Sequence, residues 1–235
     1  MKMIRIALDA MGGDVAPRET VQGAVLAVQD AELRKLAGGP FQVVLVGRRE
    51  DIERELPQDK SIPLDLLPIV DAREVVEMHE HPAQACKKKK DSSIVRCHEL
   101  LRDGDVSASV SAGNSGATLA AALFTCGRIK GVSRPAITTM VPSVQGVSVL
   151  VDAGANMDCT GKHLLQFALM GEAYARTALG FNSPRVGLLS IGEEDSKGND
   201  LVFEAQTLLK QVPFNYIGNV EGRDICNGKC DVIVC

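Results

Sequence analysis

The amino-acid sequence predicts a three-layer α/β fold with a mostly parallel sheet. Short apolar runs alternate with longer stretches of helical periodicity along the whole chain. The runs are almost continuously apolar, as expected for parallel strands that helices cover on both faces. No internal repeat, low-complexity tract or Ser/Pro-rich linker interrupts this alternation. We therefore expect residues 1–235 to form a single α/β domain.

The elements follow in order from local patterns. The predicted strands are Ile4–Leu8, Val43–Val46, Asp65–Val70, Val106–Val110, Ile137–Val141, Val147–Val151, Val186–Ile191, Asn215–Ile217 and Val232–Val234. The predicted helices are Pro17–Leu36, Ser93–Arg102, Ser115–Thr125, Lys162–Leu179 and Leu201–Gln211. Pro17 suits a first helical turn, where its missing N–H has no partner in any case. We expect Asp14 to cap that helix and Gly38 and Gly39 to end it.

Composition excludes several classes of protein. The chain has 235 residues, of which 45% are hydrophobic and 24% charged, so it can bury a sizeable core and is not intrinsically disordered. Only 3% of residues are aromatic, there is no Trp, and the net charge is −4. A protein that binds nucleic acid by base stacking and phosphate attraction needs the opposite composition. We therefore expect no nucleic-acid partner.

Targeting signals and metal-ligand patterns are missing from the sequence. No secretory signal opens the chain, and no apolar run reaches the roughly 18–20 residues of a membrane span. The seven cysteines are scattered without a C-x-x-C pair, which is typical of reduced thiols in the cytoplasm. One group of possible metal ligands is close in sequence and comprises His79, His81, Cys86, Cys97 and His98. Its spacing is not that of a zinc site, so we predict no metal site.

Glycine-rich polar loops follow five of the predicted strands. They are Asp9–Asp14, Ser111–Ala117, Asp152–Asn156, Gly192–Asn199 and Gly218–Arg223. Ligands of open α/β sheets bind at the carboxyl ends of the strands, so we expect these loops to converge on one edge. Glycine allows close backbone approach, and a helix that starts after Gly113–Gly116 directs free N–H groups toward an anion. The residues expected to bind substrate or phosphate are Asp9, Gly12, Gly13, Asp14, Gly113, Asn114, Ser115, Gly116 and Asn219.

Familiar catalytic motifs do not occur. There is no P-loop, no Gly-x-Gly-x-x-Gly after the first strand and no Gly-x-Ser-x-Gly elbow. Cys159 has only His163 as a neighbouring base, which makes it a weak candidate for a thiol nucleophile. Inorganic phosphate itself could then attack, with the protein holding it in place. Lys197, the one cation within a Gly/Asn loop, could stabilise a developing oxyanion.

The five loop segments, together with Lys87–Lys90 and Asp91-Ser92-Ser93, resemble the bacterial phosphate acyltransferase family along nearly the whole chain. The resemblance implies conversion of acyl-acyl-carrier-protein and inorganic phosphate into acyl-phosphate for phospholipid synthesis. It implies a fold similar to isocitrate and isopropylmalate dehydrogenases and to phosphotransacetylase. It also implies a cytoplasmic homodimer that associates loosely with the membrane and needs no cofactor. The family continues beyond the strand that matches Asp231–Cys235, so we expect the N-terminal two-thirds of a longer enzyme.

The resemblance also suggests roles for individual residues. Lys197, helped by Asn199, would stabilise the tetrahedral intermediate, and Asn156 would bind phosphate or orient the thioester. Several alternatives stay open. Lys87–Lys90 is either a solvated face or a landing site for the acidic carrier protein. The small residues between Leu164 and Ala178 pack in the core or form a dimer contact. The glutamates Glu193, Glu194 and Glu221 orient Lys197 or Arg223, or face water.

Two other functions are compatible with the sequence. One is a decarboxylating dehydrogenase on the related fold, which would need an arginine cluster and a set of metal-binding aspartates. The other is a non-catalytic chain that only binds the carrier protein or lipid.

Overall fold

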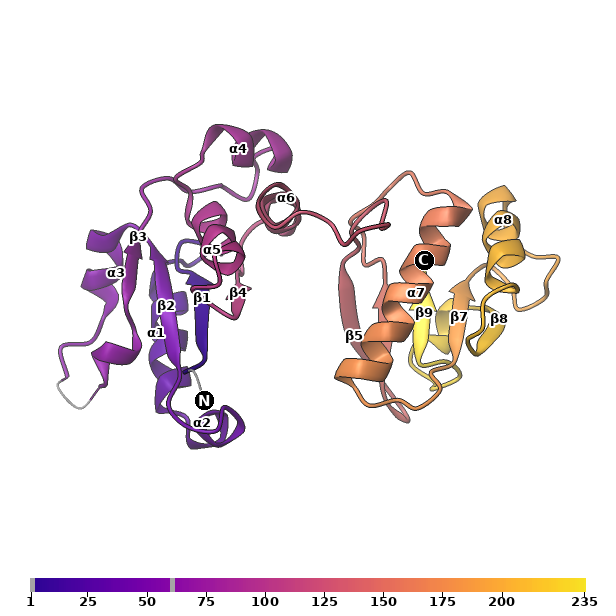
Figure 1. Ribbon diagram of the computed structural model, residues 1–235, viewed down its shortest axis with the longest axis horizontal. Coiled ribbons are helices and arrows are strands. Elements are labelled where there is room, and N and C mark those ends of the chain that lie inside the picture. Colours follow the sequence, from indigo (N-terminus) through magenta and orange to yellow (C-terminus); the bar gives the residue numbers. More distant parts are fainter. Residues whose placement is uncertain (1–2, 60–61) are drawn as a thin grey trace. The chain divides into compact units, whose positions relative to one another are not determined.

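A computed structural model describes residues 3–59 and 62–235 (Figure 1). The chain forms two compact units, Met1–Gly127 and Arg128–Cys235, where the sequence predicts one continuous domain. Each unit has its own sheet. Alternation of strands and helices indicates the fold class, but it carries no information on which strands share a sheet.

Unit 1, Met1–Gly127, is a parallel sheet in the order β3-β2-β1-β4. Its elements are β1 (Arg5–Asp9), α1 (Arg18–Gln29), α2 (Ala31–Leu36), β2 (Gln42–Gly47), α3 (Arg49–Glu55), a 3-10 turn (Leu64–Leu66), β3 (Ile69–Asp71), α4 (Pro82–Lys88), α5 (Ser93–Arg102), β4 (Ala108–Val110) and α6 (Ser115–Thr125). Val43 and Leu45 of β2 pack with α1 and α3, whereas Val44 and Val46 pack with Cys97 of α5. Helices therefore cover both faces of this sheet.

Unit 2, Arg128–Cys235, has the sheet order β5-β6-β9-β7-β8, in which only β5 runs antiparallel to its neighbour. Its elements are β5 (Thr138–Ser143), β6 (Gly146–Val151), α7 (Gly161–Ala178), β7 (Val186–Leu189), α8 (Asp200–Leu209), β8 (Tyr216–Val220), a 3-10 turn (Gly222–Asp224) and β9 (Val232–Val234). Buried residues of α7 and α8 pack on one face. Gly171 of α7 lies so close to β9 that a Cβ there would be 2.7 Å from Val232 Cγ1. This confirms core packing for the small residues of α7.

Most predicted elements are present, and the differences have local causes. The helix predicted over Pro17–Leu36 is two helices, because Asp30 is extended and its carboxylate accepts a hydrogen bond from the Leu33 N–H at 2.8 Å. Asp14 does not cap α1: the N-cap is Pro17, with no side-chain hydrogen bond. The short charged helix α3 and the helix α4 were not predicted.

The strand β8 is longer than predicted and includes Asn219. The sequence pattern places a turn at Gly218, but this glycine has φ +92° within a strand whose register shifts beside it. A glycine inside a strand commonly marks such a bulge. Asn219 therefore belongs to the sheet and not to the loop that follows it.

An ion pair joins the starts of β7 and β9. Arg185 donates to Asp231 through Nε at 3.0 Å and Nη2 at 2.8 Å, and the backbone N–H of Arg185 adds a third bond at 2.7 Å. Burial alone raises the pKa of Asp231, but the hydrogen bonds from Arg185 outweigh burial and hold this pKa below its usual 3.8. The two strand ends are thus held together by an ionised carboxylate.

Because the folded-state pKa of Asp231 is lowered, its contribution to stability is present above about pH 3.9 and is lost as pH falls through the folded-state value. We expect the free energy of unfolding of unit 2 to decrease as the pH drops below about 4. Asp231→Asn should make this decrease shallower. Urea unfolding at several pH values measures this through Tyr174 and Tyr216, which are both in unit 2. Asp195→Asn, at an exposed position in the same unit, is the control. An equally steep decrease in Asp231→Asn would contradict the expectation.

Candidate functional site

In unit 1, the loops after β1 and β4 are bound to each other by one buried carboxylate. Asp9, the last residue of β1, is 3% exposed, and its Oδ2 accepts a hydrogen bond from the Ser111 hydroxyl at 2.7 Å. Ser111 Oγ in turn accepts the Gly113 N–H at 3.1 Å. Asp9 therefore holds the two loops together, and its negative charge makes direct contact with phosphate unfavourable.

Gly12 allows this close approach. A Cβ at this residue would be 2.7 Å from Asp9 Oδ2 and 2.8 Å from Ser111 Oγ, which is closer than real Cβ contacts. Gly13, next along the chain, has φ +116°, a conformation that L side chains rarely adopt. Asp14 is exposed. The glycines expected in this loop thus have a steric reason to be there.

The second loop leads into α6. Asn114 is the N-cap: its Oδ1 accepts the Ala117 N–H at 3.0 Å, and its Nδ2 donates to the Met78 carbonyl at 3.1 Å. Gly116 is close to α4, since a Cβ there would be 2.7 Å from Pro82 Cγ. Asn114 thus uses its side chain within the protein, whereas Ser115 is exposed at the first turn. The free N–H groups and dipole of this turn favour an anion.

In unit 2, Asn156 is similarly engaged. Asp152, 5% exposed, accepts the Ile137 N–H and the Asn156 N–H, both at 2.7 Å. The Asn156 side-chain amide donates to Asp152 Oδ2 and to the Pro135 carbonyl, both at 2.9 Å. These bonds shape the turn after β6.

Lys197 lies in the loop between β7 and α8, and its side chain is exposed. Within residues 3–59 and 62–235, its ammonium makes no hydrogen bond or ion pair with another side chain. Asn199 is the N-cap of α8 and accepts the Val202 N–H at 3.0 Å. Asn219, from β8, donates to the carbonyls of Glu194 at 3.1 Å and Lys197 at 3.2 Å. A cation free to meet a ligand is thus held on a well-bonded loop.

The neighbouring acidic residues pair with other cations. Glu193 is 3.0 Å from Arg223 and 2.9 Å from Lys229, and Glu221 is 3.3 Å from Arg223. The bonds from Lys229 and then Arg223 lower the pKa of Glu193. Of the open alternatives, Glu193 and Glu221 therefore orient Arg223.

Cys159 has neither the partner nor the ionisation of a thiol nucleophile. Burial raises the pKa of its thiol. His163 Nδ1 accepts the Thr160 N–H at 3.2 Å, as part of the cap of α7. In the part of the chain that the structure describes, no three His, Cys, Asp or Glu side chains are grouped to hold a metal ion. None of the described helices combines the length and apolarity that crossing a membrane requires.

The predicted site residues thus fall into two groups. The loops after β1 and β4 come together in unit 1, and those after β6, β7 and β8 belong to unit 2. Sequence reasoning missed Gln206, a buried amide on α8 that bonds Asn219 Oδ1 at 3.0 Å. A signal existed, because Val202, Ala205, Gln206 and Leu209 lie on one helix face and only Gln206 is polar.

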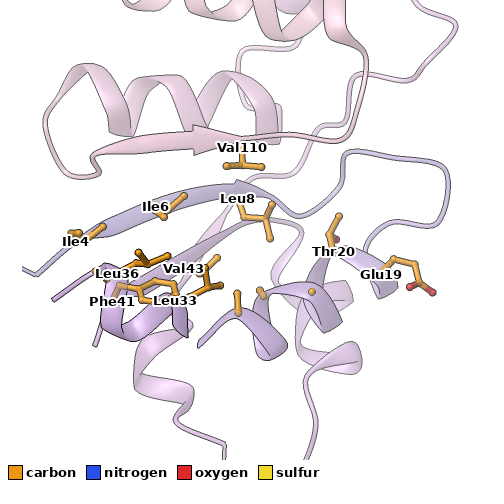
Figure 2. A pocket seen from close by; sticks show the side chains of 14 residues that line it. Ile4, Ile6, Leu8, Glu19, Thr20, Leu33, Leu36, Phe41, Val43 and Val110 are labelled. Atoms are coloured by element: carbon orange, nitrogen blue, oxygen red, sulfur yellow. The ribbon is translucent and has the colours of Figure 1, made fainter. Parts of the chain in front are cut away.

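An apolar cavity of about 510 Å³ lies beside the unit 1 loops. Figure 2 shows Ile6 and Leu8 on β1 and Ile4 just before it, with Leu33 and Leu36 of α2 across from them. Leu8 and Val110, two of the lining residues, directly precede Asp9 and Ser111. The wall is almost wholly hydrocarbon, unlike the polar loops next to it.

Comparisons with known proteins give a consistent result. The family model described as "Fatty acid synthesis protein" matches residues 4–235. A phosphate acyltransferase of Pelotomaculum thermopropionicum is 52% identical over 232 residues, covering 99% of this chain and 65% of the relative. One from Desulforamulus reducens is 50% identical, covering 99% and 67%. The chain thus spans about two thirds of the length of these relatives.

Solved structures with the same fold have much lower sequence identity. EutD phosphotransacetylase from Staphylococcus aureus has a TM-score of 0.64 at 18% identity, over 99% of this chain and 77% of that one. A phosphotransacetylase from Streptococcus pyogenes has a TM-score of 0.66 at 18% identity, with the same coverage. These likenesses establish the three-layer α/β fold with its mostly parallel sheets.

Proposed function

The chain belongs to the fatty acid synthesis protein family, and from that membership we propose that it transfers an acyl group from acyl-acyl-carrier-protein to inorganic phosphate. The observation that carries the proposal is the match to relatives named phosphate acyltransferase, which are 52% and 50% identical over 99% of this chain. The product would be an acyl-phosphate for phospholipid synthesis.

In the proposed reaction, a phosphate oxygen attacks the thioester carbonyl carbon. A C–O bond forms, the C–S bond breaks, and the carrier leaves as a thiolate that takes up a proton. The first turn of α6, with Ser115 and the backbone of Gly116, is proposed to bind phosphate in unit 1. Lys197 is proposed to stabilise the oxyanion of the tetrahedral intermediate. Asn114, Asn156 and Asn199 support this chemistry by shaping their loops.

The proposal is tested by incubating the purified protein with acyl-carrier protein and phosphate and measuring acyl-phosphate release. Dependence of product on both substrates supports it. Reduction of NAD with a hydroxy acid would instead indicate the dehydrogenase alternative. Retention of acyl-carrier protein without turnover would indicate a binding role only.

The acidic carrier protein is proposed to contact α4. Lys87 and Lys88 end this helix and Lys90 follows it, and Lys87 Nζ is 5.2 Å from the Phe124 ring centroid. Lys89 is different: its ammonium donates to the Val75 carbonyl at 2.7 Å and to Glu80 at 2.5 Å. Only Lys87, Lys88 and Lys90 are therefore available to a partner.

We expect the triple replacement of Lys87, Lys88 and Lys90 with Glu to raise KM for acyl-carrier protein about tenfold or more and to reduce its salt dependence. The value of kcat should change little. Lys89→Glu alone is the comparison, and it should lower stability by removing two internal bonds. An unchanged KM in the triple variant would remove α4 as the docking site.

The cytoplasmic location, the homodimer and a peripheral membrane contact are also part of the proposal. They rest on the family resemblance alone. Sedimentation measures whether the chain forms a homodimer. Flotation with anionic vesicles measures the membrane contact.

A further inference from the structure

The side-chain amide of Asn219 has no N–H donor left for an anionic ligand. Its side chain is 3% exposed, and Oδ1 accepts the Gln206 Nε2–H at 3.0 Å. Its Nδ2 donates to the Glu194 carbonyl at 3.1 Å and to the Lys197 carbonyl at 3.2 Å. A primary amide has two N–H donors, and both are used here. The reverse orientation would direct Oδ1 at two carbonyl oxygens, which is unfavourable.

The two acceptors lie at the ends of one turn. The Lys197 N–H also donates to the Glu194 carbonyl at 2.9 Å, so the Asn219 amide closes a turn that is already hydrogen-bonded. Gln206 is 5% exposed on α8, and it fixes the amide from the opposite side. A buried, hydrogen-bonded side-chain network of this kind makes a loop rigid.

We propose that Asn219, oriented by Gln206, is a positioning residue that fixes the turn carrying Lys197, and that it does not bind phosphate. This inference rests on the proposed function only for the importance of Lys197 to the reaction. A mobile loop would carry a four-carbon ammonium side chain through many positions. A fixed turn limits that freedom at the residue's backbone, where the side chain starts.

Trypsin tests the proposal directly, because it cleaves after an exposed lysine in a loop that can open. Asn219→Asp keeps an acceptor for Gln206 but sets a carboxylate against the two carbonyl oxygens. Loss of hydrogen bonds to a buried polar group typically raises the equilibrium constant for local opening about tenfold. We therefore expect cleavage after Lys197 to be about tenfold faster. Cleavage after Lys130 serves as the internal reference, and Asn182→Asp, at an exposed position in unit 2, is the matched control. Unchanged Lys197 cleavage in folded Asn219→Asp would overturn the proposal.

A second measurement needs no variant at Asn219. In the wild-type protein, the Asn219 side-chain NH₂ signals should exchange with solvent much more slowly than those of Asn182. Equal exchange rates would also overturn the proposal, even if Asn219→Asp fails to fold. Gln206→Ala, which removes one bond of the network, should increase Lys197 cleavage by a smaller factor.

Kinetics separate positioning from phosphate binding. In the acyl-phosphate assay, Asn219→Asp should lower kcat and leave KM for phosphate unchanged, whereas loss of a phosphate ligand would raise that KM. Proteolysis and amide exchange do not depend on turnover. If the chain forms no acyl-phosphate, the proposed function fails while these two measurements still decide whether Asn219 holds the turn.

Discussion

Replacing Lys197 with alanine is expected to lower kcat for acyl-phosphate formation by about 10²–10³-fold, the usual cost of losing one donor to a developing oxyanion. The free energy of unfolding should be nearly unchanged. The side chain is exposed and has no side-chain partner within the described residues, so its removal leaves no buried group unpaired. Steady-state kinetics and urea unfolding of the same preparation measure both effects.

Lys162→Ala is the matched control for that experiment. Lys162 is an exposed lysine in the first turn of α7, outside the loop between β7 and α8. Its replacement should change neither kcat nor stability by a measurable amount. A near-normal kcat in Lys197→Ala would remove Lys197 from the chemistry and leave its loop with a structural role.

Replacing Gly12 with alanine is expected to destabilise unit 1 by about 1–3 kcal/mol, the typical range for overpacking a filled site. The new methyl group would press on Asp9 Oδ2 and Ser111 Oγ, and a third contact is the backbone nitrogen of Gly113 at 3.0 Å. Relief of these contacts must separate the two loops that Asp9 holds together. We therefore expect a loss of acyl-phosphate formation at temperatures where the protein is still folded.

Gly23→Ala is expected to change the stability of the same unit in the opposite direction. Gly23 is inside α1, and a Cβ there meets nothing within 4 Å among the described residues. Alanine should stabilise this helix by about 0.5–1 kcal/mol. Because unit 1 has no Tyr or Trp, amide exchange of β1 is the suitable probe. If Gly12→Ala left β1 as stable as Gly23→Ala does, the close contacts at Gly12 would be relieved without loss of stability, and the expectation would be wrong.

Local patterns predicted most of the fold. The helices α5 and α6 and the strand β9 have the bounds that periodicity and caps indicate. Errors arose where one residue serves two elements, as Asp30 does by ending α1 and capping α2. The division into two units was not predictable, because strand pairing depends on contacts distant in sequence.

The candidate site was predictable as a set of loops but not as a set of roles. Asparagine in a glycine-rich loop can bind a ligand or bind its own backbone, and the sequence does not distinguish the two. Asn114 and Asn199 accept backbone N–H groups at the starts of the helices that they cap, and Asn219 donates to a carbonyl of the loop between β7 and α8. Lys197 keeps its predicted role as a proposal because it has no competing side-chain partner within the described residues.

The hydrocarbon-walled cavity beside β1 has a practical consequence for handling this chain. It adjoins β4, which is an edge strand of its sheet, and Leu36 at its rim is 83% exposed. Exposed apolar surface next to an unpaired strand edge is a common origin of aggregation. Concentrated preparations of the 235-residue chain should therefore bind hydrophobic dyes and lose monodispersity, and mild detergent should restore it.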